Sequence, residues 1–235
     1  MAETVGRITS LHRYPVKSMG GERLAEAPVT LQGVMGDRGY AFVQAESKSP
    51  FPWLTGRDAA AMLNYSAALT ADSKGVEVTT PGGAVLAADS DELLSELAAL
   101  ADRPLNLLSN YRGSFDVAPV TLMARASVKA IAEASETDED HLRFRMNFYI
   151  DTGSDTPFVE NGWVGRVLRI GETVRVAVTE PDKRCVMITL DHGTGGGESS
   201  KVLRAAAELN EACAGVYGAV FTAGTVREGD EVTLE

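Results

Sequence analysis

Short runs of apolar and β-branched residues, separated by turns rich in glycine and aspartate, recur along most of the chain. Runs of this length bounded by turn residues predict β-strands. Two turns are typical of hairpins, Asp72-Ser73-Lys74-Gly75 and Gly171-Glu172. The predicted strands cover residues 5–16, 40–44, 65–70, 76–80, 120–122, 144–150, 167–170, 173–179, 186–190, 216–222 and 231–234.

Three segments show helical signals instead. Asp89 followed by Glu92 forms a capping-box pattern, and the leucines after it fall on one helical face. Ser127 is predicted to cap a short helix that ends near Glu136, and a third helix is expected over residues 199–212. Many short strands with few helices indicate an α+β, β-rich fold that contains a closed or partly closed barrel.

An irregular stretch lies near the middle of the chain. Residues 101–115 lack a clear apolar period and contain Pro104 and Gly113, which interrupt regular structure. We therefore predict a domain boundary here, with one domain over residues 5–112 and a second over residues 113–235.

Composition and charge narrow the partners that the chain is expected to have. Its 235 residues include 44% hydrophobic and 23% charged residues, which is typical of a globular protein with a substantial core. A net charge of −11 repels nucleic-acid phosphates and anionic lipid, so neither nucleic acid nor membrane is an expected partner. No signal-peptide pattern or bilayer-length apolar run is evident, and we expect a cytoplasmic protein with unpaired cysteines.

Cys185, one of the two cysteines, follows directly after Lys183 and Arg184. Neighbouring cations lower a thiol pKa, and a thiolate is both a nucleophile and a soft metal ligand. The pattern therefore predicts a reactive or metal-ligating cysteine. The alternative is a buried cysteine at the start of the strand over 186–190, with two solvated cations beside it. Cys213 lies among small residues and is predicted to serve packing.

Two glycine-rich turns carry further cations. In YPVKSMGG, Lys17 and Ser18 follow a predicted strand end, and lysine, hydroxyl and exposed backbone N–H groups together suit a phosphate. In GVMGDRGY, Arg38 stands between glycines, from where its side chain can reach an anion. The alternatives are an ordinary turn with a surface lysine, and an arginine paired with Asp37.

The stretch RFRMN adds two arginines and an amide. If it is a strand, alternation places Arg143, Arg145 and Asn147 on one face and apolar residues on the other. Such a polar face is expected either to be exposed or to hold a polar ligand.

Taken in order, several stretches resemble proteins with a MOSC domain, the family named after the C-terminal domain of molybdenum cofactor sulfurase. YPVKS, GDRGYAFV and WLTGRD are similar to the N-terminal MOSC-associated domain, and FRMN, PDKRCVMITLD and VYGAVFTAGTVREGDEV are similar to the MOSC domain itself. The pattern is most similar to the bacterial and mitochondrial amidoxime-reducing proteins. It departs from them at Met146 and His192, where relatives often have proline.

The resemblance implies a fold and a cofactor. The fold is a MOSC-type β-barrel with a few helices, preceded by an N-terminal β-barrel-like subdomain. The cofactor is the molybdenum cofactor, with Cys185 as its metal ligand and catalytic residue. The residues similar in position to those that hold the cofactor in relatives are Lys17, Ser18, Arg38, Ser127, Arg145, Asn147, Arg184 and Tyr217.

The function implied by the resemblance is that of an oxidoreductase. It is expected to reduce small N-hydroxylated or N-oxide substrates by two-electron removal of an oxygen atom. The chain to Glu235 has no cysteine cluster for an iron–sulfur centre, so an external donor is expected, such as a ferredoxin, a flavodoxin or a cytochrome b5-like protein with its reductase. The alternatives are a non-catalytic carrier of the cofactor, or of sulfur as a Cys185 persulfide, and a small flavin-binding barrel.

Overall fold

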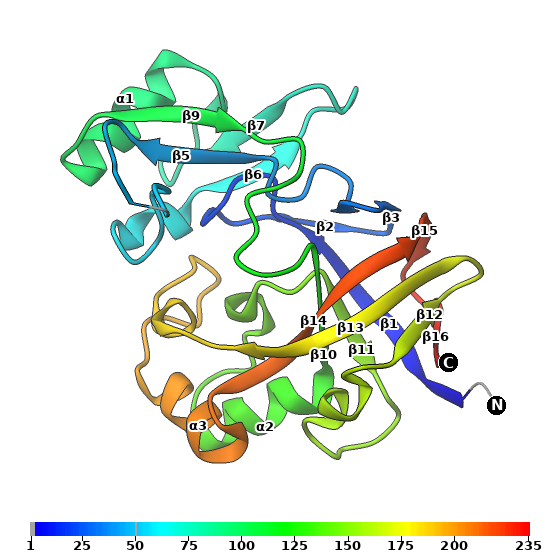
Figure 1. Ribbon diagram of the computed structural model, residues 1–235. Coiled ribbons are helices and arrows are strands. Elements are labelled where there is room, and N and C mark those ends of the chain that lie inside the picture. The colour runs from blue at the N-terminus through cyan, green and yellow to red at the C-terminus, as the bar shows by residue number, and fades with distance from the viewer. Residues whose placement is uncertain (1–2, 50) are drawn as a thin grey trace.

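The computed structural model describes residues 3–49 and 51–235, which form two lobes (Figure 1). One lobe is a β-barrel covered by two helices, and the other consists of two small sheets and a helix. No helix in the described part of the chain is long and apolar enough to cross a membrane. The predicted α+β, β-rich fold is confirmed.

The barrel is a ring of seven strands in the described part of the chain, each hydrogen-bonded to two neighbours. All neighbouring pairs are antiparallel except β10 and β11, which run parallel. In order around the ring, the strands are β1 (Glu3–Arg13), β11 (Phe148–Asp151), β10 (Val120–Ala124), β14 (Cys213–Thr222), β13 (Val174–Lys183), β12 (Val167–Ile170) and β16 (Glu231–Leu234).

Apolar side chains that alternate along these strands fill the barrel. Leu122, Phe148, Leu168 and Val176 are fully buried in this cluster, and each contributes about 1.5–3 kcal/mol by leaving water. Closure also removes the sheet edges that would otherwise invite pairing with other chains. The barrel is therefore a firm support for residues at the ends of its strands.

Strands from the two ends of the sequence pair with each other outside the ring. β15 (Gly224–Arg227) pairs with β3 (Glu26–Thr30), which pairs with β4 (Gly33–Val34). β2 (Glu22–Leu24) pairs with the last residues of β1, beyond the stretch that pairs with β16. The first 34 residues thus belong structurally to the barrel lobe as much as to the other lobe.

The second lobe has its own apolar core, formed around Phe42, Met62, Leu93 and Leu97. Figure 1 shows its helix packed beside the two small sheets. Its elements are β5 (Tyr40–Gln44), η1 (Ala60–Asn64), β6 (Ser66–Leu69), β7 (Val76–Thr79), β8 (Val85–Ala87), α1 (Asp91–Ala101) and β9 (Leu105–Ser109).

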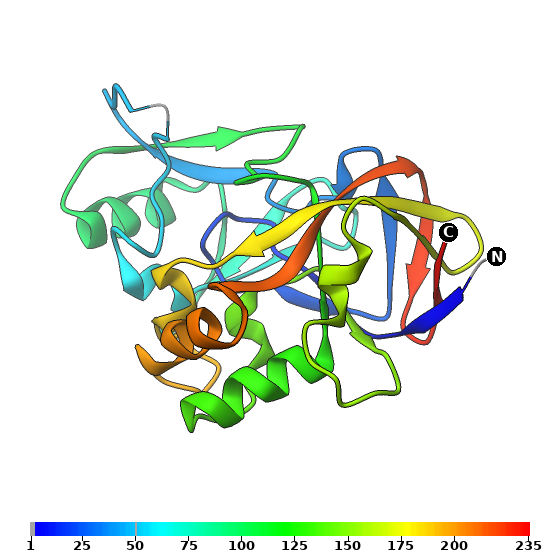
Figure 2. The same cartoon turned by 60° about the horizontal axis from the view of Figure 1, so that its bottom comes forward.

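Helices α2 (Arg125–Ser135) and α3 (Lys201–Asn210) pack against one side of the barrel, as Figure 2 shows from below. Val128, Ile131 and Val202 bury their side chains there against Tyr149. Three short 3₁₀ turns complete the described part of the chain: η2 (His141–Phe144), η3 (Val159–Trp163) and η4 (Val186–Thr189).

Five local predictions are wrong. Residues 186–189 form the turn η4 rather than a strand, and residues 141–144 form η2, so the strand expected at 144 begins only at Phe148. Residues 105–109, expected to be irregular, form β9. In the helix caps, Ser90 replaces Asp89 and Ala124 replaces Ser127. In each case an apolar run or a polar cap residue fitted two neighbouring solutions, and tertiary packing selected one of them.

Candidate functional site

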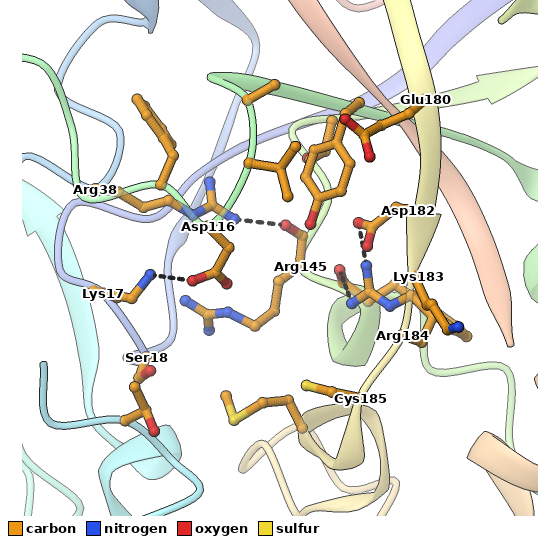
Figure 3. A pocket seen from close by; sticks show the side chains of 18 of the residues that line it. Lys17, Ser18, Arg38, Asp116, Arg145, Glu180, Asp182, Lys183, Arg184 and Cys185 are labelled. Atoms are coloured by element: carbon orange, nitrogen blue, oxygen red, sulfur yellow. Dashed lines mark hydrogen bonds and ion pairs between the residues drawn. The ribbon is translucent and has the colours of Figure 1, made fainter. Parts of the chain in front are cut away.

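A cavity of about 410 Å³ lies where the two lobes meet, and both lobes contribute to its walls (Figure 3). Within this cavity, Lys17, Arg38 and Arg57 come from the first part of the chain. Arg145, Lys183 and Arg184 come from the second part. The carboxylates in its lining are Asp116, Glu180 and Asp182.

Cys185 is exposed and lines this cavity. It follows the last residue of β13 by two positions, and it precedes η4 as the N-cap residue. The Arg184 backbone N–H donates to the carbonyl of Ala212 over 2.7 Å, which ties this strand end to β14. The cysteine is therefore not at the start of a buried strand. It lies on the rim of the barrel, where solvent and a ligand can reach it.

Arg184 is held beside the cysteine by two contacts. Its Nη1 forms an ion pair with Asp182, and its Nη2 donates to the Phe144 carbonyl over 2.9 Å. The Nε of Arg184 is buried and, among the described residues, has no hydrogen-bond partner. Burial raises the pKa of Asp182, and Arg184 opposes that rise. This guanidinium therefore keeps one buried donor without an acceptor.

Lys17 reaches the cavity from the opposite wall. Its Nζ lies 2.8 Å from the Ser114 carbonyl oxygen, 2.8 Å from Asp116 Oδ1, and 4.9 Å from the centre of the Trp53 ring. Burial lowers the pKa of Lys17, and Asp116 opposes that effect. The ammonium group is thus fixed in place, with one ion-pair partner.

Three lining residues have left-handed backbone conformations. The φ angles are 63° for Ser18, 50° for Arg38 and 55° for Arg145. Such conformations are uncommon outside glycine and typically cost about 1–3 kcal/mol at constrained sites. Their presence at three positions of one cavity indicates that the fold holds these side chains in orientations that relaxed backbone would not give.

The guanidinium groups of Arg38 and Arg145 lie against the same aromatic ring. They are 5.0 Å and 4.5 Å from the centre of the buried Tyr14 ring. Arg38 Nη2 donates to the Arg145 carbonyl over 2.9 Å, and Arg145 Nη1 donates to the Met19 carbonyl over 2.6 Å.

The charge of Arg145 is only partly compensated. Burial and the nearby Arg38 lower the pKa of Arg145 to about 10. Its Nη2 is buried and, within the described part of the chain, has no hydrogen-bond partner. Two closely spaced guanidiniums with an unused donor are suited to an anion.

Comparison with known proteins identifies the family. The family model of the MOSC domain matches residues 111–233, and that of the MOSC N-terminal beta barrel domain matches residues 5–103. The chain belongs to the MOSC family. No curated protein matches it. MOSC domains are associated with the molybdenum cofactor, and the chain shares that association at the level of the family.

One solved structure supports the same fold at low sequence identity, and two others are similar to a lesser degree. The YUAD protein of Bacillus subtilis is 11% identical with a TM-score of 0.52, and the match covers 100% of this chain and 97% of that chain. YiiM of Escherichia coli is 12% identical with a TM-score of 0.45, covering 97% and 69%. YiiM of Geobacillus stearothermophilus is 14% identical with a TM-score of 0.40, covering 50% and 54%.

Most of the residues that the MOSC resemblance implied meet in one cavity. Seven of them line it: Lys17, Ser18, Arg38, Arg145, Arg184, Cys185 and Tyr217. Burial raises the pKa of Tyr217, and the neighbouring charge of Asp182 acts in the same direction. The Arg38–Asp37 ion pair, which the sequence offered as an alternative to ligand binding, is formed. Arg38 nevertheless also lines the cavity.

Ser127 and Asn147 are not among the residues that line the cavity. Ser127 lies inside α2, where its hydroxyl donates to Glu160 over 2.9 Å and accepts from the Phe158 N–H over 2.7 Å. Asn147 is buried, and its Nδ2 donates to Asp37 Oδ2 over 3.1 Å. Asn147 therefore supports the site through the carboxylate that pairs with Arg38.

Arg143 does not share a face with Arg145, because this segment is not a strand. Arg143 is buried and its Nη1 donates to the Ile188 carbonyl over 2.9 Å, while Nη2 lies 3.5 Å from Asp140. This arginine holds η4, and with it the segment after Cys185, against η2.

Sequence reasoning did not identify several residues of the cavity. Asp116, Glu180 and Asp182 line it as acids, and Tyr14 lies behind it as the ring under two arginines. Arg57 lies within WLTGRD, a stretch that already resembled the family. The signal for Asp182 was its position beside Lys183 and Arg184, and Tyr14 is the first residue of YPVKS, which also resembled the family, whereas Asp116 carries no local pattern.

Proposed function

We propose that the chain binds the molybdenum cofactor in this cavity, with Cys185 as the ligand to molybdenum, and reduces small N-hydroxylated or N-oxide compounds. The observation that carries the proposal is the meeting of an exposed thiol with Lys17, Arg38, Arg145 and Arg184 in one cavity. These residues come from distant parts of the sequence.

The lining fits the cofactor chemically. The cofactor has an anionic phosphate, a polar pterin and a metal that accepts soft sulfur ligands, and the cavity offers cations, unused donors and a thiol. The unpartnered donors are Arg145 Nη2 and Arg184 Nε, both among the described residues. A buried donor without a partner typically costs about 1–3 kcal/mol, and a ligand that accepts from it relieves that cost.

Each residue has a distinct task in this proposal. Lys17, Ser18 and Arg38 hold the phosphate, and Arg145 and Arg184 donate to the polar body of the cofactor. Cys185 holds the metal near the solvent-exposed rim, where a substrate can approach. The bound cofactor supplies the capacity to take an oxygen atom in a two-electron step.

The net reaction converts an N–OH group to N–H and releases water. It consumes two electrons and two protons, and we propose an external redox protein of the ferredoxin, flavodoxin or cytochrome b5 type as the electron source. The exposed carboxylate of Glu180 lines the cavity and is available to interact with protons or a cationic substrate.

The catalytic part of the proposal is tested by turnover. Chain produced in a host that makes the cofactor is incubated with benzamidoxime and an artificial reductant, and benzamidine is quantified. We expect sustained turnover by the unaltered chain and none by Cys185→Ala. An absence of turnover in chain that carries molybdenum would contradict the proposed reaction.

The exposure of Cys185 also favours a second candidate function, that of a carrier. A thiol on the rim is accessible to another protein, so the same site suits delivery of the cofactor or of sulfur as a persulfide. Transfer of cofactor to an acceptor enzyme without turnover of benzamidoxime would favour the carrier, and turnover at a steady rate would exclude it as the sole role.

A further inference from the structure

Asp116 differs from the other carboxylates of the cavity in how it is held. It lies between β9 and β10, in the segment that connects the two lobes, and 66% of its side chain is exposed. Its Oδ1 accepts from Lys17 Nζ over 2.8 Å, although only 8% of the Lys17 side chain is exposed. An exposed carboxylate therefore reaches in to neutralise a buried ammonium.

Asp37, by contrast, is a permanent part of the structure. Its side chain is fully buried, it accepts from the Tyr14 N–H over 2.7 Å and from Asn147 Nδ2 over 3.1 Å, and it forms an ion pair with Arg38. Removing this carboxylate from its position would break all three interactions. Moving the Asp116 side chain breaks its contact with Lys17.

The charges of this part of the cavity form a small set. Lys17, Arg38 and Arg145 lie close enough to influence one another's ionisation, and the Asp116 charge favours the protonated form of all three. Arg57 also lines the cavity, and its charge acts on Asp116. These four cations face Asp37 and Asp116, and moving Asp116 away leaves one further positive charge uncompensated.

Figure 3 shows Asp116 between Lys17 and Arg145, at the wall of the cavity. Its carboxylate thus occupies space in front of the cations that a ligand's anionic group would use. A phosphate monoester near neutral pH is mostly dianionic, so it replaces the negative charge of Asp116 and adds one more against the excess of cations.

We propose that Asp116 is a specificity-determining residue that occupies the anion position of the ligand-free site. Only a dianionic group, such as a phosphate monoester, displaces it from Lys17. A monoanion only replaces the displaced carboxylate charge for charge and gains nothing further, whereas a dianion gains one additional negative charge against the cations. The inference rests on the proposed function for the identity of the ligand, but it concerns how this site selects charge.

Inorganic phosphate is the probe for the test, and Trp53 is the reporter because Lys17 lies against its ring. Fluorescence titrations of the ligand-free chain are compared for the unaltered protein, Asp116→Asn and Asp116→Ser. The other tryptophan, Trp163, is buried in the barrel core and serves as a constant background. We expect both variants to bind phosphate about tenfold or more tightly than the unaltered chain.

Asp155→Asn is the matched control, because Asp155 pairs with Lys129 over 3.3 Å on the exposed surface and does not line the cavity. It changes net charge by the same amount, and we expect its phosphate affinity to stay within about twofold of the original. A monoanion, acetate, provides the second comparison. We expect acetate to bind the unaltered chain too weakly to detect and to bind Asp116→Asn measurably, because the competing carboxylate is gone.

Equal phosphate affinity in the unaltered chain and both Asp116 variants would overturn the inference, as would an equal gain in Asp155→Asn. Adding Lys17→Met to Asp116→Asn should abolish the gain if the two residues act on one subsite. The titration needs no molybdenum, so its failure is distinguishable from a failure of the proposed function. That function fails instead when the chain takes up no metal.

Discussion

Among single residues, Tyr14 is unusual because its buried ring contacts two guanidinium groups, those of Arg38 and Arg145. Cation–π contacts of this kind contribute about 0.5–2 kcal/mol each. The Tyr14 hydroxyl is buried and, among the described residues, has no hydrogen-bond partner. The ring rather than the hydroxyl should therefore position the two arginines.

Two substitutions separate these contributions. We expect Tyr14→Phe to leave anion affinity unchanged and the free energy of unfolding equal or slightly higher, since it removes an unpaired polar atom. We expect Tyr14→Leu to weaken phosphate binding about tenfold or more, because both guanidiniums lose their support. Titration calorimetry and denaturant unfolding measure the two effects. A Phe variant as impaired as the Leu variant would show that the hydroxyl is what matters.

His12 provides a prediction about pH. Burial, together with the nearby charge of His141, lowers the pKa of His12 to about 4 from an ordinary value of 6.5. The folded protein then binds this proton less tightly than the unfolded chain does. The contribution of this pKa difference to the free energy of unfolding is fully present above pH 6.5. It is lost as the pH falls from 6.5 toward 4, because the unfolded chain takes up the proton first.

The measurement compares unfolding of the unaltered chain and His12→Gln from pH 7.5 to pH 4. We expect the difference in free energy of unfolding between them to shrink by about 3 kcal/mol across that interval, because the variant lacks the titrating group. Groups that do not act on His12, including His192 with a pKa of about 4, titrate in both proteins and cancel. Parallel pH profiles would contradict the assignment.

Sequence reasoning at this scale identified residue types better than residue surroundings. Cys185 beside Lys183 and Arg184 was sufficient to single out the thiol, and the glycine turns drew attention to Lys17 and Arg38. It could not show that Arg38 and Arg145 share one aromatic ring, because that contact joins parts of the chain more than a hundred residues apart.

At the level of whole elements, α1 gives a clear test of how a helix begins. The sequence favoured Asp89 as its N-cap, whereas the structure places Ser90 there, with its hydroxyl accepting from the Leu93 N–H over 3.3 Å. Both are good cap residues, but Glu92 completes a capping box only with Asp89, since Leu93 stands three residues after Ser90. Only the packing of Leu93 and Leu97 in the lobe core selects the register.

We expect Ser90→Ala to lower the free energy of unfolding by about 1 kcal/mol, because the Leu93 N–H loses its acceptor. Asp89→Ala should cost less than half as much when both are measured in ~0.5 M salt, which screens the helix dipole. Chemical denaturation gives both values. A larger loss of unfolding free energy for Asp89→Ala than for Ser90→Ala would support Asp89 as the N-cap and contradict Ser90.

The end of β13 shows why apolar runs alone do not define strands. Residues 186–190 are apolar or β-branched and were predicted to be a strand. Residues 186–189 instead form η4, with Ile188 buried against the helices. Short buried runs of either kind have the same composition. The consequence for function is direct, because a turn places Cys185 at the rim instead of within a sheet.

In the molecule as a whole, the first strand belongs to the barrel that the last half of the chain forms. β1 pairs with β11 on one side and with β16 on the other. A chain of residues 113–235 alone would leave both partners with unpaired edges, so we expect it to aggregate or remain unfolded. Circular dichroism and size-exclusion chromatography would show this.

A rearranged chain is the matched control. Glu3 pairs with Leu234, so the start of β1 lies beside the end of β16 (Figure 1). A short turn can therefore join residues 113–235 to residues 3–24, which restores β1 in antiparallel register. We expect this permuted chain to be monomeric and to unfold cooperatively. A cooperative, monomeric fold for residues 113–235 without β1 would contradict the dependence.

The overall architecture was predictable as a class, because alternating runs and frequent glycine turns require many short strands. The barrel itself followed from the family resemblance more than from periodicity. The order of strands around the ring was not predictable, since β1 and β11 are joined by contacts more than 130 residues apart, and no local pattern specifies such pairing. The same interleaving brings the two walls of the cavity together.

The account depends most on Cys185 as the residue that holds molybdenum in the cavity. The most direct measurement is the molybdenum content of purified chain from a host that synthesises the cofactor, for the unaltered protein, Cys185→Ala and Cys213→Ala. We predict about one molybdenum per chain in the first and third, and less than about a tenth of that in Cys185→Ala. Equal molybdenum in all three, or none in any, would contradict it.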